Sequence, residues 1–435
     1  MLAIITPAAA RDMPRPETFT LRNGMQVVVI TDRRAPVVTH QVWYRVGAAD
    51  EPRGQSGIAH FFEHLMFKGT RQIAPGEFSR TIARNGGDDN ASTSWDYTVY
   101  YERIARDRLE LVMRMEADRM RNLRLLPEDI ASERDVIVEE RRSRIDNSPG
   151  GVLSERMRAM LYPQHPYGTP VIGWLHEIQA LDREAALEFY RVWYAPNNAI
   201  LVVAGDIDAA ELRPLAERIY GRVRPTRDLP AREWVRDPPS AGPMRVVHRD
   251  EKVRQPSLSR FYRAVSYGAD EGRQAHALDV AMDILGGSET SRFYRALVEE
   301  RQIAVAAGAG ANTGGLGGGQ ASVWGSPADG VSLDTLEAAI DEVIATFLRD
   351  GPTEAELNRA KSSLAAAAIY SRDSQEALAN VYGQSLVQGE TIDEIVSWPT
   401  DIEAVTREEV MAIVRETLNI DNSVTGQLLP LEAPQ

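Results

Sequence analysis

The stretch His60-Phe61-Phe62-Glu63-His64 places two histidines and a glutamate in the pattern H-x-x-E-H. In a helix, residues three and four apart lie on one face, so His60 and His64 can point at one metal ion with Glu63 beside them. Imidazole suits Zn²⁺, and a catalytic zinc typically has three protein ligands and one water. A carboxylate at Glu63 can take a proton from that water. The pattern therefore predicts a zinc site that needs one more ligand.

The flanking segments favour a metal site over a chance spacing of polar residues. Two histidines and a glutamate can occur at this spacing in any polar helix, and a motif match is only a hypothesis. Here Gly57-Ile58-Ala59 precedes the motif and Leu65-Met66-Phe67 follows it. Apolar neighbours are expected of a half-buried helix, and they limit the water around a metal.

The composition excludes several classes of protein. The chain has 435 residues and a net charge of -14, from 63 acidic and 49 basic residues, which argues against binding to nucleic acid. It contains no cysteine, so histidine and carboxylate must hold the metal. No apolar stretch of about 20 residues is present, so no membrane span is expected. Residues 1–10 (MLAIITPAAA) resemble the end of a signal peptide or are an ordinary N-terminus, which leaves bacterial periplasm and cytoplasm both open.

The chain contains two similar halves. Ile178–Arg191 (IQALDREAALEFYR) matches Ile402–Arg415 (IEAVTREEVMAIVR) without gaps at Ile, Ala, Arg, Glu and the final Arg. The same register places Asn198 opposite Asn422, each just before a predicted strand. Similarity at one fixed offset indicates an internal duplication. We therefore predict two homologous domains, residues 1–221 and 245–435, joined by a linker rich in Pro and charge at 222–244.

Each half combines hairpins with helices, which predicts an α+β fold with a largely antiparallel sheet packed with helices. Asn23-Gly24 is a turn signal between two strand-like runs. The expected elements of the first half are strands at Thr18–Leu21, Met25–Thr31, Val37–Val46, Tyr97–Ile104 and Ala199–Ala204, the motif helix, and helices near Arg106–Arg121, Glu128–Ile145 and Arg183–Trp193. The second half repeats this order, with helices expected near Gln274–Leu285 and Ser291–Arg301.

The third metal ligand must come from another element. The helix expected after Pro127 contains Glu133 and Glu140, which are two turns apart and share one face. Glu139 is adjacent to Glu140 and points about 100° away. One of these two can face the metal while the other faces solvent, and the spacing does not choose between them.

Four segments together resemble a known family. They are GIAHFFEHLMFKGT at 57–70, GGDDNASTSWDYTVYYE at 86–102, ERDVIVEE at 133–140 and HPYGTPVIG at 165–173. The set is similar to the M16 metallopeptidases, or inverzincins, over nearly the whole chain. The strongest resemblance is to the short bacterial M16B subunits and the beta subunit of the mitochondrial processing peptidase. It implies a two-domain chain that forms half of a clamshell around a peptide substrate.

The resemblance also assigns roles to individual residues. It implies that His60, His64 and Glu140 bind one Zn²⁺ per chain and that Glu63 is the general base. Glu133 would support a zinc ligand from behind, as such sites commonly need.

Two further residues are assigned to substrate. Asn90 and Ala91 match an edge strand that pairs with an extended peptide, a mode that reads main chain more than side chain. In the second half, the register from Pro127 to Pro352 places Asn358 and Ala365 where the first half has Glu133 and Glu140. The resemblance therefore implies a second domain without a metal site.

The chain departs from the family at Val298 and Val305. Many active relatives have an Arg and, seven residues later, a Tyr at these positions, and the pair holds the substrate carbonyl or stabilises the oxyanion. Two explanations are open: a related subunit supplies the pair in a heterodimer, or the chain is a weak or altered enzyme alone, with a homodimer possible. A different alternative is a non-catalytic core subunit of a larger complex.

The segment Gly308–Gly319 is rich in glycine. It lacks the Gly-Lys-Ser/Thr of a phosphate loop, and a flexible strand connection is expected there.

Overall fold

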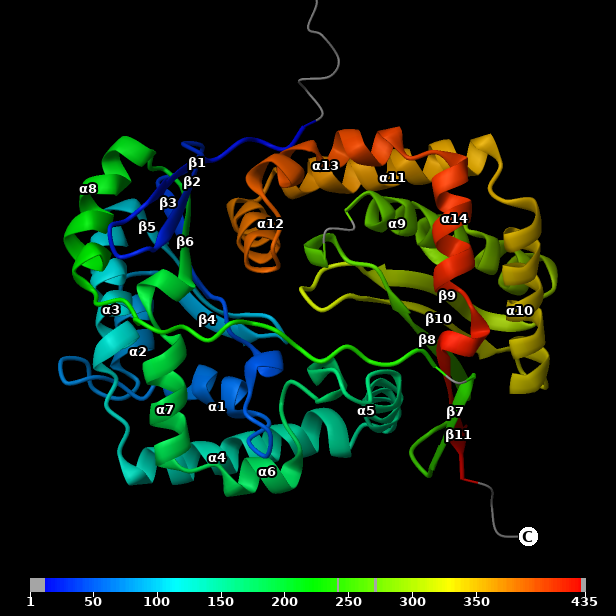
Figure 1. The fold of residues 1–435 in the computed structure, drawn as a ribbon, viewed down its shortest axis with the longest axis horizontal. Helices are drawn as coiled ribbons and strands as arrows, with labels where there is room; N and C mark the ends of the chain where they lie inside the picture. Colours follow the sequence, from blue (N-terminus) through cyan, green and yellow to red (C-terminus); the bar gives the residue numbers. More distant parts are fainter. Residues whose placement is uncertain (1–11, 241, 270–271, 432–435) are drawn as a thin grey trace, which may run out of the picture.

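The computed structural model describes residues 12–240, 242–269 and 272–431. The chain forms two halves, each built on a β-sheet with helices packed against it (Figure 1). Residues 1–10, which carry the resemblance to a signal peptide, lie outside the described residues. In the part of the chain that is described, no helix is both long and apolar enough to cross a membrane.

The first half contains a six-stranded sheet with the strand order β1-β2-β6-β3-β5-β4. β2 and β6 are parallel, and the other neighbouring pairs are antiparallel. β6 is buried along its whole length, as its run of apolar residues requires. The strands are β1 (Glu17–Thr20), β2 (Gln26–Thr31), β3 (Val37–Tyr44), β4 (Asp88–Thr93), β5 (Thr98–Ala105) and β6 (Ala199–Gly205).

The helices of the first half pack mainly on one face of this sheet, where the larger core lies. The motif helix α1 contacts α4, α7 and the edge strand β4. The helices are α1 (Ile58–Leu65), α2 (Glu77–Arg84), α3 (Leu109–Asn122), α4 (Pro127–Arg141), α5 (Pro149–Leu161), α6 (Leu175–Ala180), α7 (Arg183–Trp193) and α8 (Ala209–Ile219).

The second half repeats the arrangement with five strands in the order β7-β11-β8-β10-β9. β7 and β11 are parallel, as β2 and β6 are, and the remaining pairs are antiparallel. The strands are β7 (Met244–Asp250), β8 (Ser257–Ala264), β9 (Ala304–Asn312), β10 (Gly319–Pro327) and β11 (Ser423–Pro430). The helices are α9 (Gly272–Gly286), α10 (Leu333–Asp350), α11 (Glu354–Ser371), α12 (Gln375–Val387), α13 (Ile392–Ala404) and α14 (Arg407–Thr417). The prediction of two α+β domains with largely antiparallel sheets is confirmed, and we propose 1–221 and 245–435 as their limits.

Each sheet is also covered by a helix from the other half (Figure 1). α12 packs on the face of the first sheet that contains Trp43, and α5 packs on β7 and β11 of the second sheet. The approach is close, because a Cβ on Gly383 of α12 would overlap the ring of Trp43. A Cβ on Gly426 of β11 would likewise overlap Met157 of α5. The two halves therefore share their apolar cores.

The glycine-rich segment Gly308–Gly319 begins as the end of β9, which runs to Asn312, and ends at the first residue of β10, Gly319. The short connection between them is anchored to the first half. The Leu316 N–H donates to Asp96 Oδ2 at 3.2 Å, and the Gly317 N–H donates to the Tyr167 hydroxyl at 3.0 Å. The segment connects two strands as expected, but its connection is tied to the first half.

Candidate active site

Backbone contacts at the start of α1 determine where its histidines point. Both oxygens of the buried Glu51 carboxylate accept hydrogen bonds, from Gly57 N–H and Ala59 N–H at 2.9 Å each. Gly57 has a φ of 86°, and a Cβ on Gly173 would lie 2.5 Å from the Ser56 carbonyl oxygen. Only glycine fits at Gly57 and at Gly173, where the two backbone segments pass each other closely. The loop that ends at Gly173 therefore packs directly on the start of the motif helix.

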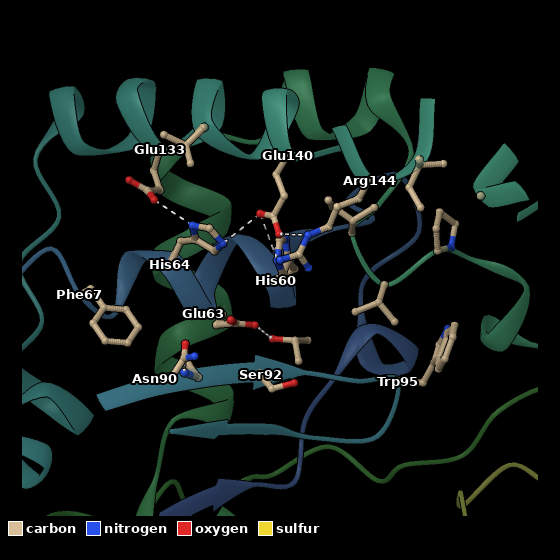
Figure 2. A pocket seen from close by; sticks show the side chains of 18 of the residues that line it. His60, Glu63, His64, Phe67, Asn90, Ser92, Trp95, Glu133, Glu140 and Arg144 are labelled. Carbon is tan, nitrogen blue, oxygen red and sulfur yellow. Dashed lines mark hydrogen bonds and ion pairs between the residues drawn. The ribbon is translucent and has the colours of Figure 1, made fainter. Parts of the chain in front are cut away.

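His60, His64 and Glu140 converge on one point between α1 and α4 (Figure 2). Glu140 Oε2 lies 3.3 Å from His64 Nε2 and 3.6 Å from His60 Nε2. One candidate ligand atom from each residue lies within 4.8 Å of the others, and no second such group occurs among the described residues. Glu139 points outward, with a side chain 67% exposed and paired with Arg142. The structure thus brings Glu140, and not Glu139, to the histidines.

The chemistry of this donor set fits Zn²⁺. Two imidazole nitrogens and one carboxylate oxygen form the His₂Glu set found at catalytic zinc sites, which keep a fourth position open. The surroundings attract positive charge, because Glu133 and Glu140 raise the pKa of His64 to about 9 although burial opposes the shift. His60 is more deeply buried, and desolvation together with the charge of His64 lowers its pKa to about 4.

Glu133 supports His64 from behind. Its Oε1 lies 2.9 Å from His64 Nδ1, so Nδ1–H can donate to it while Nε2 faces Glu140. Lys68 forms an ion pair with the other oxygen of Glu133. The hydrogen bond and the ion pair lower the pKa of Glu133 although burial opposes the shift, so it is a carboxylate at neutral pH. Lys68 was not predicted as a site residue, although it lies one turn after His64 on the sequence.

Glu63 lies on the face of α1 that also presents His60 and His64, next to the edge strand β4. The Thr93 hydroxyl donates to Glu63 Oε2 at 2.5 Å. Burial raises the pKa of Glu63, and the hydrogen bond from Thr93 partly opposes that shift. Thr93 was missed by sequence reasoning because it lies 30 residues from Glu63 and its role depends on how the strand folds back.

β4 is the edge of the first sheet and pairs only with β5 among the described strands. Asn90 and Ala91 lie on this strand and line the same cavity as the histidines, as do Ser92 and Thr93. The cavity has a volume of about 1120 Å³. The Asn90 side chain accepts a hydrogen bond from the Ala91 N–H at 2.9 Å, so this donor is occupied by its neighbour.

Two sequence comparisons assign the family. Residues 26–173 match the family described as Insulinase (Peptidase family M16), and residues 180–364 match the Peptidase M16 inactive domain. Zinc protease PqqE of Helicobacter pylori is 30% identical over 384 residues, which cover 87% of this chain and 85% of that protein. The chain belongs to peptidase family M16. A probable mitochondrial-processing peptidase subunit beta of Schizosaccharomyces pombe is 30% identical over 220 residues, 51% of this chain and 48% of that one.

Solved structures agree with this M16 assignment. A protease from Helicobacter pylori superposes with a TM-score of 0.89 at 27% identity, over 96% of this chain and all of the other (100%). Pitrilysin superposes with a TM-score of 0.77 at 17% identity, over 98% of this chain but 46% of pitrilysin. The second likeness concerns the fold alone. This M16 chain has the architecture of one half of a pitrilysin-type clamshell, as expected.

The second M16 domain differs from the first at the matching positions. α11 contains Asn358 and Ala365, which cannot replace a pair of carboxylates. Val298 lies half-buried against the second core, and Val305 is 57% exposed on the edge strand β9. Neither valine is among the described residues that line the cavity at His60.

The remaining histidines have other surroundings. His40 is buried between Glu102 and Tyr220, each 2.8 Å from a ring nitrogen. His165 accepts the Tyr167 N–H at 3.1 Å within the loop that precedes Gly168. These contacts give both histidines a structural role. His176, His248 and His276 are outside the one candidate metal group of the described residues.

Proposed function

We propose that this chain is a zinc-dependent endopeptidase that cuts oligopeptides or unfolded segments held as an extended strand in a chamber. The observation that carries the proposal is the convergence of His60, His64 and Glu140 beside Glu63, in a cavity bordered by a free strand edge. Membership of a family whose relatives are named zinc proteases supports it. One zinc ion per chain would occupy the site.

The side chains of the site can divide the chemistry between them. Zn²⁺ held by His60, His64 and Glu140 would supply Lewis acidity for peptide-bond hydrolysis. Glu63 accepts a proton from the attacking water and then protonates the leaving amine. Thr93 holds one oxygen of Glu63, which leaves the other oxygen for the water. Glu133 fixes the ring of His64 with Nε2 facing Glu140, where it would bind the metal.

The edge strand β4 supplies a place for the substrate. A peptide in extended conformation can add to a free edge through main-chain hydrogen bonds, with Asn90 and Ala91 among its contacts. The Asn90 side chain would have to turn away from the Ala91 N–H for that donor to reach the peptide. Binding through the main chain suits a peptidase that accepts many sequences.

We further propose that a related M16 subunit completes the active site. The chain covers 46% of pitrilysin, and it has Val298 and Val305 where the family resemblance implies an Arg and a Tyr that hold the substrate carbonyl. A heterodimer whose partner supplies that pair accounts for both observations. A chain that works weakly alone or as a homodimer is the competing explanation. A non-catalytic core subunit is disfavoured, because such a protein has no need of an intact donor set with its base.

A peptidase assay separates these possibilities. The zinc-loaded chain is incubated with a quenched fluorescent peptide, alone and together with the product of an adjacent homologous gene. Activity only in the mixture is expected for a divided active site. Full activity of the chain alone would reject the heterodimer. Stoichiometric zinc with no activity in either sample would favour the core-subunit alternative.

A further inference from the structure

Nearly every charged side chain on the wall of the active-site cavity has a partner of opposite charge. Lys68 pairs with Glu133, and Arg144 Nε lies 3.0 Å from Glu140 Oε1. Glu155 accepts two hydrogen bonds of 2.9 Å from Arg141, a neighbour behind the wall. The titratable side chains of the wall are His60, Glu63, His64, Lys68, Glu133, Glu140, Arg144, Glu155 and Arg158.

Glu63 and Arg158 are the exceptions, and Glu63 is held by the neutral Thr93 hydroxyl. Within residues 12–240, 242–269 and 272–431, the guanidinium of Arg158 has neither an acidic partner nor a hydrogen bond. Arg158 extends from α5, and its guanidinium lies over the indole of Trp95 with its Cζ 4.4 Å from the ring centroid. Desolvation lowers the pKa of Arg158, although a guanidinium stays protonated at neutral pH. A partly buried cation without an anion is incompletely stabilised, and a carboxylate that enters the cavity would supply the missing partner.

Trp95 makes a fixed platform for this cation. Its indole N–H donates to the Thr169 carbonyl at 2.9 Å, which holds the ring in place. A guanidinium stacked on an aromatic ring keeps its N–H groups free in its own plane, where they can grip a carboxylate with two hydrogen bonds. Arg158 and Trp95 both line the cavity.

The strand β4 shows where Arg158 and Trp95 lie relative to Glu63, the proposed base. Thr93, the last residue of the strand, holds Glu63, and Trp95 follows two residues later. Figure 2 shows Glu63 between Asn90 and Trp95, which lie toward opposite ends of the site. Trp95 lies just past the strand, in the turn to β5, and a strand advances about 3.3 Å per residue, so we take its position to correspond to a point one to three residues along an extended peptide from its cut bond.

We propose that Arg158 stacked on Trp95 is a subsite for a carboxylate of the substrate, so that the enzyme prefers peptides with an acidic group one to three residues from the cut bond. This inference rests on the proposed peptidase function. The carboxylate has two possible sources, an Asp or Glu side chain or the C-terminus of the peptide. Both present the same planar anion to the guanidinium.

The test compares quenched peptides that differ in one position. Glu or its uncharged isostere Gln is placed at each of the three positions on either side of the cut bond, and kcat/KM is measured with the active preparation, including the partner if it is needed. A second series compares free with amidated C-termini. We expect a preference on the order of 10-fold for the charged member at one position in one series. That series identifies the source of the carboxylate.

Substitutions then assign the preference to Arg158. Arg158→Gln should bring the Glu peptide to the level of the Gln peptide, and Arg158→Glu should favour Lys at the same position. Ser154→Glu places an acid one turn earlier on α5, where it can pair with Arg158 and lower the preference without removing the guanidinium. Arg156→Gln is the matched control, since Arg156 is exposed, faces His248 and is not among the described residues of the cavity wall.

Two results would overturn the proposal, and they are distinguishable. Efficient cleavage with equal rates for charged and uncharged peptides, or a preference that survives both Arg158→Gln and Ser154→Glu, rejects the subsite and leaves the peptidase standing. Absence of cleavage of every peptide by zinc-loaded preparations, with and without the partner, rejects the proposed function and the subsite together.

Discussion

At the scale of single residues, the role of Glu63 is the most direct to test. Glu63→Gln keeps the size of the side chain and its hydrogen bond from Thr93 but removes the basic oxygen. General-base catalysis contributes on the order of 10²–10⁴ in rate, so kcat should fall by at least that much. Zinc content, measured by elemental analysis, should stay unchanged because Glu63 is not one of the three converging donors. Activity that survives the substitution would show that the base is elsewhere.

Glu133 should affect zinc affinity more than chemistry. Glu133→Gln weakens the contact with His64 Nδ1 and leaves Lys68 without its acid. Supporting carboxylates of this kind are worth roughly 10–100-fold in metal affinity. The zinc Kd, measured by competition with a chelator, should rise by that factor. Glu139→Gln on the same helix is the control, and an equal rise there would contradict the assignment.

Thr93 should affect kcat with little change in KM. Thr93→Val removes the hydroxyl that holds Glu63 Oε2 at 2.5 Å while keeping the shape of the side chain. A hydrogen bond to a charged group is worth about 1.5–3 kcal/mol, so a loss on the order of 10-fold in kcat is expected. Thr93→Ser should restore activity. A rise in KM alone would show that Thr93 binds substrate instead of positioning the base.

The candidate site shows where sequence reasoning ends. Helical periodicity alone places His60, Glu63 and His64 on one face, because that relation is local. It cannot choose between Glu139 and Glu140, since both helix phases are compatible with the spacing. In the structure, α4 is rotated about its axis so that Glu140 faces His64 on α1 and Glu139 faces Arg142. Contacts across distant elements, such as Arg158 on Trp95, leave no periodic signal in the sequence.

At the scale of elements, the predicted strands and helices agree with the structure except where tertiary packing changes a local preference. The helix expected over Glu128–Ile145 is α-helical only to Arg141, and Arg142–Asp146 forms a π-helical turn that contains Arg144. Most of the helix expected at Ser291–Arg301 is also π-helical, from Tyr294 to Glu300. Propensity does not distinguish these turns from an ordinary helix, and π-turns are frequent at functional sites.

The contact of α12 with the first sheet predicts that a glycine-to-alanine substitution in a helix lowers the stability of the protein, where it would normally raise it. Alanine normally stabilises a helix by up to about 1 kcal/mol relative to glycine. At Gly383, however, the new methyl group would overlap Trp43, so overpacking should destabilise the protein by roughly 1–3 kcal/mol. Gly150→Ala in α5 has open space and should be neutral or stabilising. Chemical denaturation of both variants measures the difference, and a gain in stability at Gly383 would contradict the close packing.

At the scale of the whole molecule, each half packs one helix on the sheet of the other half, and this exchange joins the two halves of the duplicated chain. α12 completes the core beneath the first sheet, and α5 completes the second. Arg232 in the predicted linker adds a bidentate ion pair with Asp50, with both contacts at 2.8 Å. Neither half can be removed without exposing apolar surface of the other. The metal-free second half therefore supports the site although it contributes no ligand.

The valines at 298 and 305 allow a test of how the complete chamber forms. Val305 is 57% exposed on the free edge of β9, so a larger side chain there can reach a second subunit. A chain with Val298→Arg, Val305→Tyr and Glu63→Gln would provide the missing pair but have no base of its own. Mixed with the unaltered chain, it should restore activity to the intact zinc site. Each oxyanion donor is worth on the order of 10²–10³ in rate, so a gain of at least 10²-fold over either chain alone is expected.

The control for this complementation uses Val247, an exposed valine on β7 at the opposite edge of the same sheet. A chain with Val247→Tyr and Glu63→Gln should give no gain when mixed with the unaltered chain. The gain should depend on both protein concentrations, because the chamber forms only when two chains meet. High activity of the unaltered chain alone, or an equal gain with the Val247 control, would show that the chain does not depend on a partner for this pair.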